Sequence, residues 1–246
     1  MEAKAKVKNQ ARLRFWLVGV LLLLAWAPLL AEEVACRFGR GQWSAADWVL
    51  VKSPRWDYFG GWVQQDDHLM NEHPADATPK EMLGKRAAET YTSMVYRHKV
   101  SGRTKVSATM LFEDRMAPEL VLAGELGLDA KGRPEYREHW EIVLYDEGIN
   151  VWHHEIRDGK PFWRKAAYLK TPFQPGVQYT LEALVEFPAG GKGPQLSVTC
   201  DGKRFGCLLP TLPEPFHVGV TACEGVNRFY DFKLTTNKIH QPEEDR

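Results

Sequence analysis

Apolar and polar residues alternate along most of the chain beyond residue 40. A dozen short segments show this alternation or a short apolar run: 48–52, 61–65, 91–98, 105–112, 119–126, 136–146, 149–157, 162–169, 178–187, 195–200, 217–223 and 228–234. A period of two places every second side chain on one face of a strand, so these segments predict β-strands. Dipeptides typical of tight turns separate several of them, including Asp158-Gly159 and Asp201-Gly202. Many short strands with tight turns predict an all-β antiparallel sandwich.

A long polar segment, residues 66–89, interrupts the succession of strands. Within it, Thr78 and Glu81 have the spacing of a capping box, and Pro79 stands at the first helical position. We therefore expect one short helix inside this long loop, from residue 79 to about residue 88.

Residues 1–31 have the layout of a secretory signal peptide. Basic residues precede an apolar run, residues 15–30, and the small residue Ala31 follows it. The run is shorter than the about 20 residues that a membrane-spanning helix needs. We expect cleavage after Ala31 and a secreted, periplasmic or envelope protein without a membrane span; a retained anchor is the alternative. The sequence then predicts a single sandwich domain over residues 32–234 and a polar tail over residues 235–246.

Charge and composition narrow the possible partners. The 246 residues include 32 Lys and Arg and 32 Asp and Glu, so the formal net charge is zero. Loss of the basic leader would leave a mildly acidic chain. A nucleic-acid binder would show a basic excess, so we expect no nucleic-acid partner.

Export would place the cysteines in a compartment that permits disulfides. The four cysteines, Cys36, Cys200, Cys207 and Cys223, allow three pairings. Cys200 and Cys207 would be too far apart in a hairpin that turns at Asp201-Gly202. A bond from Cys36 to Cys223 would join the first and last parts of the domain. The sequence has no CxxC motif and therefore predicts no zinc site.

Four segments in the second half of the chain resemble a known superfamily. They are 179–183 (YTLEA), 196–203 (LSVTCDGK), 216–220 (FHVGV) and 228–234 (RFYDFKL). This succession resembles the concanavalin A-like lectin/glucanase superfamily, which includes laminin-G-like sandwiches. The resemblance implies a jelly-roll β-sandwich. Within the superfamily, the chain looks most like secreted bacterial 3-keto-disaccharide hydrolase-like domains, which implies a hydrolase that acts on sugars. The "NSG" segment of those domains and the ExDxxE pattern of glucanases are both missing here.

One predicted hairpin gathers polar and aromatic side chains on one face. If Glu147-Gly148 is its two-residue turn, Glu141 lies opposite His154. The same rule places Val143 opposite Trp152 and Tyr145 opposite Asn150. If Asp158-Gly159 is the two-residue turn of the next hairpin, the same pairing rule places Trp163 opposite His154 and Lys165 opposite Trp152. The resulting face carries His139, Glu141, Tyr145, Asn150, Trp152, His154, Trp163 and Lys165.

This face favours carbohydrate binding. Indole rings stack on the apolar face of a pyranose, while carboxylate, amide and imidazole groups bond its hydroxyls. We therefore expect a glycan or oligosaccharide partner, with His139, Tyr145, Asn150, Trp152, Trp163 and Lys165 as ligand-binding residues. A glycoside or 3-keto-disaccharide hydrolase is the alternative, with Glu141 and His154 as catalytic residues. A structural or protein-interaction domain of the cell envelope is a second alternative, in which the same side chains only stabilise neighbouring strands.

The sequence predicts no cofactor and no metal ligands. His68 and His73 are five residues apart in a predicted loop, which is no recognised metal spacing. Glu113 and Asp114 follow an apolar strand and could join a calcium site. A charged strand end is the simpler interpretation.

Overall fold

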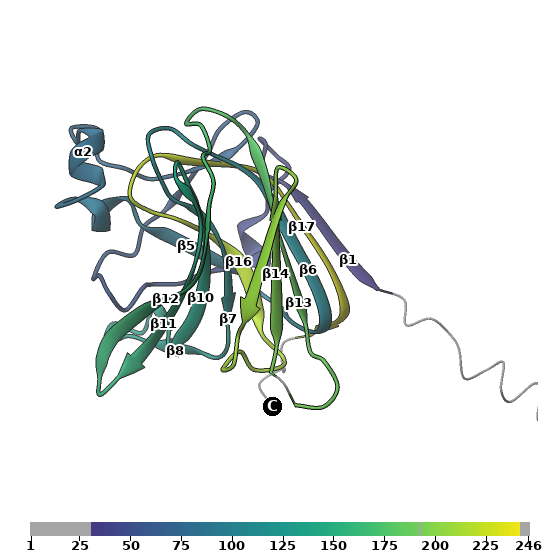
Figure 1. Ribbon diagram of the computed structural model, residues 1–246. Helices are drawn as coiled ribbons and strands as arrows, with labels where there is room; N and C mark the ends of the chain where they lie inside the picture. The colour runs from purple at the N-terminus through teal and green to yellow at the C-terminus, as the bar shows by residue number, and fades with distance from the viewer. Residues whose placement is uncertain (1–30, 192, 242–246) are drawn as a thin grey trace, which may run out of the picture. The chain divides into compact units, whose positions relative to one another are not determined.

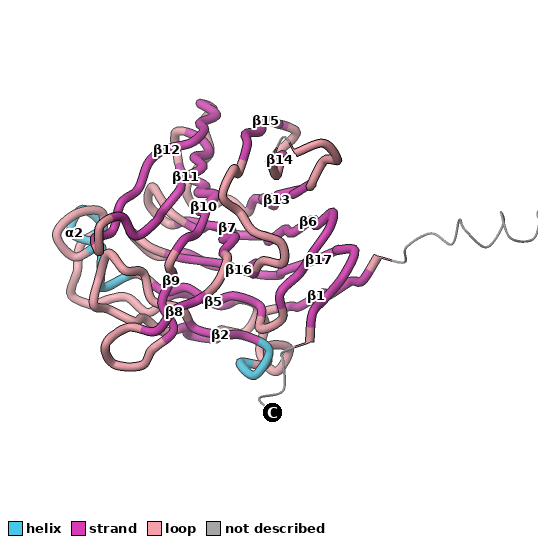
Figure 2. The backbone as a smooth tube through the Cα atoms, turned by 90° about the horizontal axis from the view of Figure 1, so that it is seen from below, coloured by secondary structure: helices cyan, strands magenta, loops and turns pink. Residues whose placement is uncertain are grey.

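Two antiparallel sheets form the sandwich (Figures 1 and 2). The computed structural model describes residues 31–191 and 193–241. The larger sheet contains, in spatial order, β15 (Lys203–Leu208), β14 (Gln195–Cys200), β13 (Tyr179–Glu186), β6 (Lys99–Phe112), β17 (Asn227–His240), β4 (Leu69–Asn71) and β3 (Trp62–Gln64), and β1 (Glu32–Arg37) also pairs with β17. The second sheet contains β12 (Lys160–Lys170), β11 (Gly148–Arg157), β10 (Glu138–Tyr145), β7 (Pro118–Ala123), β16 (His217–Ala222), β5 (Thr92–Tyr96) and β2 (Trp48–Leu50). A separate hairpin joins β8 (Leu126–Leu128) to β9 (Pro134–Tyr136). The predicted all-β antiparallel sandwich is confirmed.

The hydrophobic core lies between the two sheets. Alternate residues of β10 point into it, namely Trp140, Ile142 and Leu144, as the sequence predicted. They meet inward residues of β6 and β17: Val106, Ala108, Met110, Phe229, Phe232 and Leu234. Because these positions alternate, the intervening residues of β10 point away from the core, toward the outer face of the second sheet.

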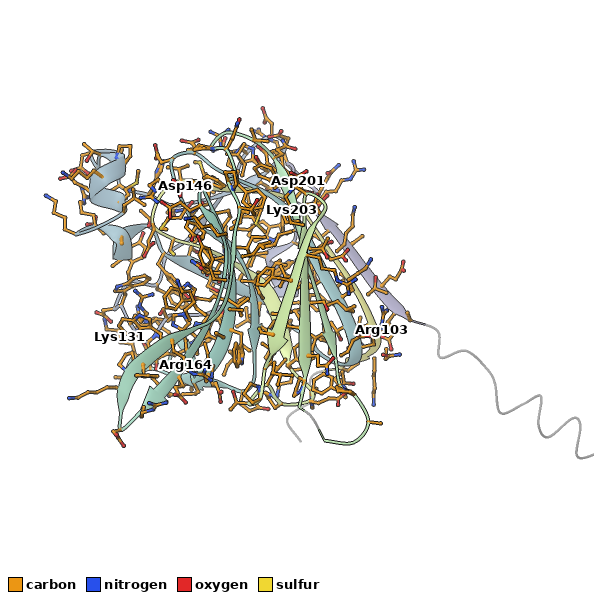
Figure 3. All side chains as sticks on the ribbon, viewed as in Figure 1. Arg103, Lys131, Asp146, Arg164, Asp201 and Lys203 are labelled. Atoms are coloured by element: carbon orange, nitrogen blue, oxygen red, sulfur yellow. The ribbon has the colours of Figure 1, made fainter. Side chains whose placement is uncertain are left out.

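Two predicted turns are confirmed and a third is wrong. Asp201 and Gly202 turn between β14 and β15, and the tip is marked by Asp201 in Figure 3; Asp158-Gly159 turns between β11 and β12. The predicted turn at Glu147-Gly148 lies instead one residue earlier, because Tyr145 pairs with Gly148. Gly148 is a strand residue, and a Cβ there would lie 2.1 Å from the Leu169 carbonyl oxygen of β12. The glycine therefore reflects both the close approach of a neighbouring strand and a φ of 155°. In the sequence, such a glycine cannot be distinguished from a turn glycine.

That shift changes the partners across the hairpin by two residues. Glu141 lies opposite Trp152 and His139 lies opposite His154, so the predicted Glu141–His154 pairing is wrong. A shift by two keeps every side chain on its original face. The predicted polar and aromatic face of β10 and β11 is therefore intact. Across the next turn, Trp163 lies opposite His154 and Lys165 opposite Trp152, as predicted.

The predicted helix is present but shorter than expected. In α2 (Pro79–Met82), the Thr78 side chain accepts from the Glu81 backbone N–H, and the Glu81 side chain accepts from the Thr78 backbone N–H, so the capping box is confirmed. Gly84 lies two residues after the last helical residue, and its poor helix propensity favours this early end. The 3₁₀ turns η1 (Ala45–Asp47) and η2 (Ala87–Thr90) are separate elements. In the part of the chain that the structure describes, no helix is long and apolar enough to cross a membrane.

The last strand extends beyond the predicted domain boundary at residue 234. β17 pairs with β6 as far as His240, although residues 235–246 read as a polar tail. Thr236 is fully buried there. Its hydroxyl lies 2.7 Å from that of Thr104 and donates to the Ser101 carbonyl, so the buried hydroxyl is hydrogen-bonded. A polar strand end whose hydroxyls are paired gives no apolar pattern to detect. The predicted signal peptide lies, apart from Ala31, outside the described residues.

All four cysteines are thiols without a disulfide. The pairing of Cys36 with Cys223 is therefore wrong. Cys36 lies on β1 at the larger sheet, whereas Cys223 follows β16 in the second sheet. The two positions belong to different layers of the sandwich.

Candidate functional site

The predicted site residues lie on the outer face of the second sheet. His139 and Glu141 alternate with core residues on β10, and His154 extends from β11 on the same side. Although they point away from the core, the side chains of all three are almost completely buried. Loops that pass over this face shield them from water.

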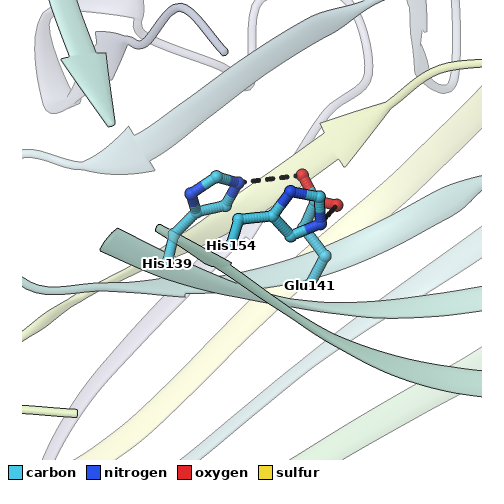
Figure 4. Close-up of side chains that lie close together, drawn as sticks. All are labelled: His139, Glu141 and His154. Carbon is cyan, nitrogen blue, oxygen red and sulfur yellow. Dashed lines mark hydrogen bonds and ion pairs between the residues drawn. The ribbon is translucent and has the colours of Figure 1, made fainter. Parts of the chain in front are cut away.

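Two imidazoles hold the Glu141 carboxylate (Figure 4). His139 Nε2 lies 3.1 Å from Glu141 Oε1, and His154 Nε2 lies 2.8 Å from Oε2. The His139 ring stacks between Tyr136 and His154, with centroids 4.2 and 4.7 Å away. The carboxylate is thus fixed in position by one contact on each oxygen.

These contacts set the charge of the cluster. Burial alone would raise the pKa of Glu141, but the charge of His154 and the hydrogen bond from His139 outweigh burial and hold the pKa well below its usual range. Burial lowers the pKa of His139 to about 4. At neutral pH, Glu141 is therefore an ionised carboxylate that accepts a hydrogen bond from a neutral His139.

His139, Glu141 and His154 also offer the residue types of a metal centre. One ligand atom from each lies within 4.8 Å of the others, and two imidazoles with one carboxylate form a known ligand set. However, each carboxylate oxygen faces one imidazole at a hydrogen-bonding distance. His139 Nδ1 has no partner, whereas the second nitrogen of a metal-bound histidine normally donates to one. The His139–Glu141 hydrogen bond and the unpartnered Nδ1 of His139 fit a metal-free cluster better than a metal site, although among the described residues His154 Nε2 has no hydrogen-bond partner of its own.

Glu141 forms part of the wall of a pocket of about 240 Å³. Four aromatic side chains line the pocket: Trp56, Tyr91, Trp152 and Trp163. Two further carboxyl groups, Glu119 and Glu224, face it together with Arg55, Asn150, His154 and Cys223. The volume is slightly below the about 300–1,000 Å³ of typical small-molecule sites, which suits a single sugar ring.

Glu119 on β7 is the second carboxyl group beside Glu141. Its strand partner is Val143, so it lies diagonally across from Glu141 on the same face. The residue is 2% exposed. Burial and the negative charge of Glu141 raise the pKa of Glu119 well above its usual range, although the Cys223 thiol donates to its Oε1 over 3.4 Å. Glu119 is therefore protonated at a pH at which Glu141 is ionised.

Several buried polar atoms of the pocket lining have no hydrogen-bond partner. Among the described residues they are Tyr91 Oη, Glu119 Oε2, Asn150 Oδ1 and His154 Nε2, the last of which lies 2.8 Å from Glu141 Oε2 without hydrogen-bond geometry. Buried polar atoms are paired in the great majority of cases, so an unpaired group needs an explanation. The pocket therefore offers unpaired polar atoms to any polar group that enters it.

The structure brings most of the predicted residues together. Glu141, Asn150, Trp152, His154 and Trp163 line the pocket. His139 is not part of the lining, but it contacts Glu141, which is. The remaining two lie outside the lining: Tyr145 packs near Tyr168, and the Lys165 ammonium lies 4.8 Å from the Tyr168 ring centre.

Sequence reasoning missed the residues that other elements bring to the pocket. Arg55 and Trp56 come from the loop between β2 and β3, and Tyr91 directly precedes β5. Glu119 was part of a predicted strand, and its acidic side chain on an otherwise apolar strand was the available signal. Cys223 and Glu224 follow β16, where Glu224 has a left-handed backbone with φ of 54°. Such a conformation is uncommon for a residue other than glycine and is enriched at functional sites.

Comparison with known proteins identifies the fold. No protein-family model and no curated protein sequence matches the chain. Among solved structures, a glycoside hydrolase family 16 endo-glucanase from Bacteroides ovatus has a TM-score of 0.52 at 9% identity, over 82% of this chain and 99% of that one. A seed lectin from Lotus tetragonolobus has a TM-score of 0.51 at 9% identity, over 87% of this chain and 100% of that one. The chain is a concanavalin A-like sandwich, as its sequence predicted.

Proposed function

We propose that this protein binds a glycan in the pocket and cleaves it by acid–base chemistry. The observation that carries the proposal is the pair Glu119 and Glu141. The two carboxyl groups share one pocket, and their environments shift the two pKa values in opposite directions. Opposite shifts within one site separate the roles of proton donor and ionised carboxylate, as glycoside cleavage requires.

The aromatic lining supports a sugar as the ligand. Trp152 and Trp163 present ring faces on which the C–H face of a pyranose can stack. The Trp163 side chain remains 45% exposed, so it can contact a further sugar unit outside the pocket. The unpaired atoms of Tyr91, Glu119 and Asn150 would bond the hydroxyls of the bound ring. The endo-glucanase and the lectin of the same fold act on or bind sugars, which is in keeping with this function.

Each polar group then has a defined part in the reaction. Glu119 holds the proton that the leaving oxygen needs when the glycosidic bond breaks. Glu141, held by His139 and His154, supplies the negative charge that stabilises the positive charge developing on the sugar. His154 lines the pocket and contacts Glu141, which places it to orient the attacking water. The proton that this water loses as it adds to the sugar passes to Glu119, which gave its own proton to the leaving oxygen.

The release of reducing ends from a panel of polysaccharides and oligosaccharides tests this proposal. We expect at least one glycan to be cleaved by the wild type. The Glu141→Gln variant should lose at least about 100-fold in rate, because it lacks the charge of the carboxylate. Glu155→Gln is the matched control: Glu155 lies on the neighbouring strand β11, but its partner is Arg157 and it is no part of the pocket lining. Full activity in Glu141→Gln would contradict the proposed mechanism.

A non-catalytic glycan-binding function is the second candidate. The aromatic residues continue beyond the pocket, since Lys165 lies over both Trp152 and Tyr168 on the exposed side. Such a surface would suit a chain that binds across the sheet. Saturable binding of a glycan without any product, weakened equally by Trp152→Ala and Trp163→Ala, would favour this candidate over the enzyme.

A further inference from the structure

Arg55 is held at the pocket by two indole rings. The central carbon of its guanidinium lies 4.3 Å from the ring centre of Trp56 and 4.6 Å from that of Trp163. Trp56 is its chain neighbour, whereas Trp163 belongs to β12, so the arginine links the loop to the sheet. Its backbone N–H donates to the Ser53 hydroxyl, which orders the loop at its base.

The guanidinium has no polar partner of its own. In residues 31–191 and 193–241, neither an ion pair nor a hydrogen bond to the Arg55 side chain is present. Arg37, Arg164 and Arg204 share this property, but all three are exposed to solvent, whereas Arg55 is partly buried. A guanidinium carries five N–H donors, and burial without acceptors is unfavourable. Arg55 therefore has donors available for a group that enters the pocket.

The stacking geometry determines which group fits. Aromatic rings near the faces of a guanidinium leave its N–H bonds accessible around its edge, since these bonds lie in the plane of the group. A carboxylate is planar and accepts two parallel hydrogen bonds from such an edge. The free edge of the Arg55 guanidinium is therefore better suited to bind a carboxylate than a single hydroxyl group.

The pocket lining contains three glutamates, Glu119, Glu141 and Glu224. Their electrostatic repulsion of an anionic ligand is weaker than that of three ionised carboxylates. Burial raises the pKa values of Glu119 and Glu224, which favours the neutral form of both. The Glu141 carboxylate is engaged by its two imidazole neighbours, with one contact on each oxygen. The lining contains one arginine, Arg55. Among the described residues, its guanidinium has no ion pair and no hydrogen bond, so its charge is available to an anionic ligand.

We propose that Arg55 recognises the carboxylate of a uronic acid unit in the pocket, so that the substrate is an acidic glycan. This inference rests on the proposed function, because it names the substrate class of the same site. Glu119 and Glu141 would act on the glycosidic bond, while Arg55 would fix the sugar through its carboxylate.

Binding of matched oligosaccharides by the full chain, measured by calorimetry, tests the inference. The probes are an oligoglucuronide, the corresponding neutral oligoglucoside and a sulfated oligoglucoside of the same length and linkage. We expect the wild type to bind the uronate at least about tenfold more tightly than the neutral sugar, as for one charge-assisted hydrogen-bonded pair. Arg55→Met should bind the uronate and the neutral sugar with equal affinity.

Two further variants separate recognition from folding. Arg55→Lys keeps the charge but lacks the planar edge, so it should lose most of the preference. Arg164→Met is the matched control, because Arg164 (Figure 3) adjoins Trp163 on β12 and is no part of the pocket lining; it should bind like the wild type. Equal affinity of the wild type for the uronate and the neutral sugar, or tightest binding of the sulfated sugar, would overturn the inference and leave the proposed function standing. If no glycan of this set or of the cleavage panel is bound or cleaved, both fail.

Discussion

The environment of Glu119 departs far from the ordinary surroundings of a carboxyl group. Its carboxyl group is buried beside a second carboxylate, and one of its oxygens has no partner. A natural protein keeps such a group at a cost in stability when function requires it. The unfavourable placement of Glu119 is therefore evidence for a role in the pocket.

This placement predicts a pH-dependent gain in stability for Glu119→Gln. The pKa of Glu119 is raised in the folded state, so the unfolded chain releases this proton at a lower pH than the folded chain does. Above pH 4.5, ionisation in the unfolded state destabilises the fold as the pH rises, by up to about 1.4 kcal/mol for each pH unit. Glutamine does not ionise, so the variant lacks this pH-dependent loss of stability. The free energy of unfolding in urea should therefore favour Glu119→Gln increasingly between pH 5 and pH 8, and a constant difference would contradict the assigned protonation.

His139 predicts the opposite trend on the acid side. Its pKa of about 4 in the folded state lies below its ordinary value, so the unfolded chain binds a proton first as the pH falls. Stability is therefore lost between about pH 6.5 and pH 4, by up to about 3 kcal/mol. His139→Gln cannot titrate but can still donate to Glu141. Urea unfolding of this variant should show a shallower loss over that pH range, and an unchanged slope would argue against a buried neutral imidazole.

At the scale of elements, the β10–β11 hairpin shows what the sequence can and cannot determine. The alternation of Trp140, Ile142 and Leu144 with polar residues identifies the inner and outer faces correctly. It cannot determine a register shift of two, because both registers bury the same side chains. The deciding contact is the approach of the Leu169 carbonyl to Gly148, which depends on a third strand.

Gly148 provides a test of this register. A Cβ at position 148 would meet the β12 backbone, so Gly148→Ala should lower the free energy of unfolding by about 1–3 kcal/mol. Gly132→Ala is a control for backbone conformation alone: φ is 75° there, and no atom lies within 4 Å of the added Cβ. Its cost should be about 1 kcal/mol. Equal effects of the two substitutions, measured by urea unfolding, would contradict the close strand contact.

At the scale of the whole molecule, the pocket combines segments that are far apart in the sequence. The hairpin residues Glu141 and His154 were recognisable because they share a local pattern. Arg55, Tyr91 and Glu224 lie in connections, where no periodicity marks the side that a residue faces. Their contribution depends on the packing of loops over the sheet, and the sequence therefore predicted the fold and one wall of the site but not the enclosed pocket.

Net charge also gave an incomplete guide to the ligand. The balanced or mildly acidic charge of the chain argued against a nucleic-acid partner but did not indicate the charges of the pocket, which holds an arginine without an acceptor among the described residues, beside carboxyl groups of shifted pKa. Local pairing and burial decide the charge that a ligand meets, because interactions within a pocket are screened less than those at the surface.

The pH dependence of kcat/KM for cleavage of the preferred glycan, compared between the wild type and Glu119→Gln, tests the central claim most directly. The account predicts that wild-type activity falls on the alkaline side as the proton of Glu119 is lost. Glu119→Gln should be slower by at least about 100-fold and should lack that alkaline decline. If Glu119→Gln keeps the wild-type rate and the same alkaline limb, the paired carboxyl groups of this pocket do not carry the reaction.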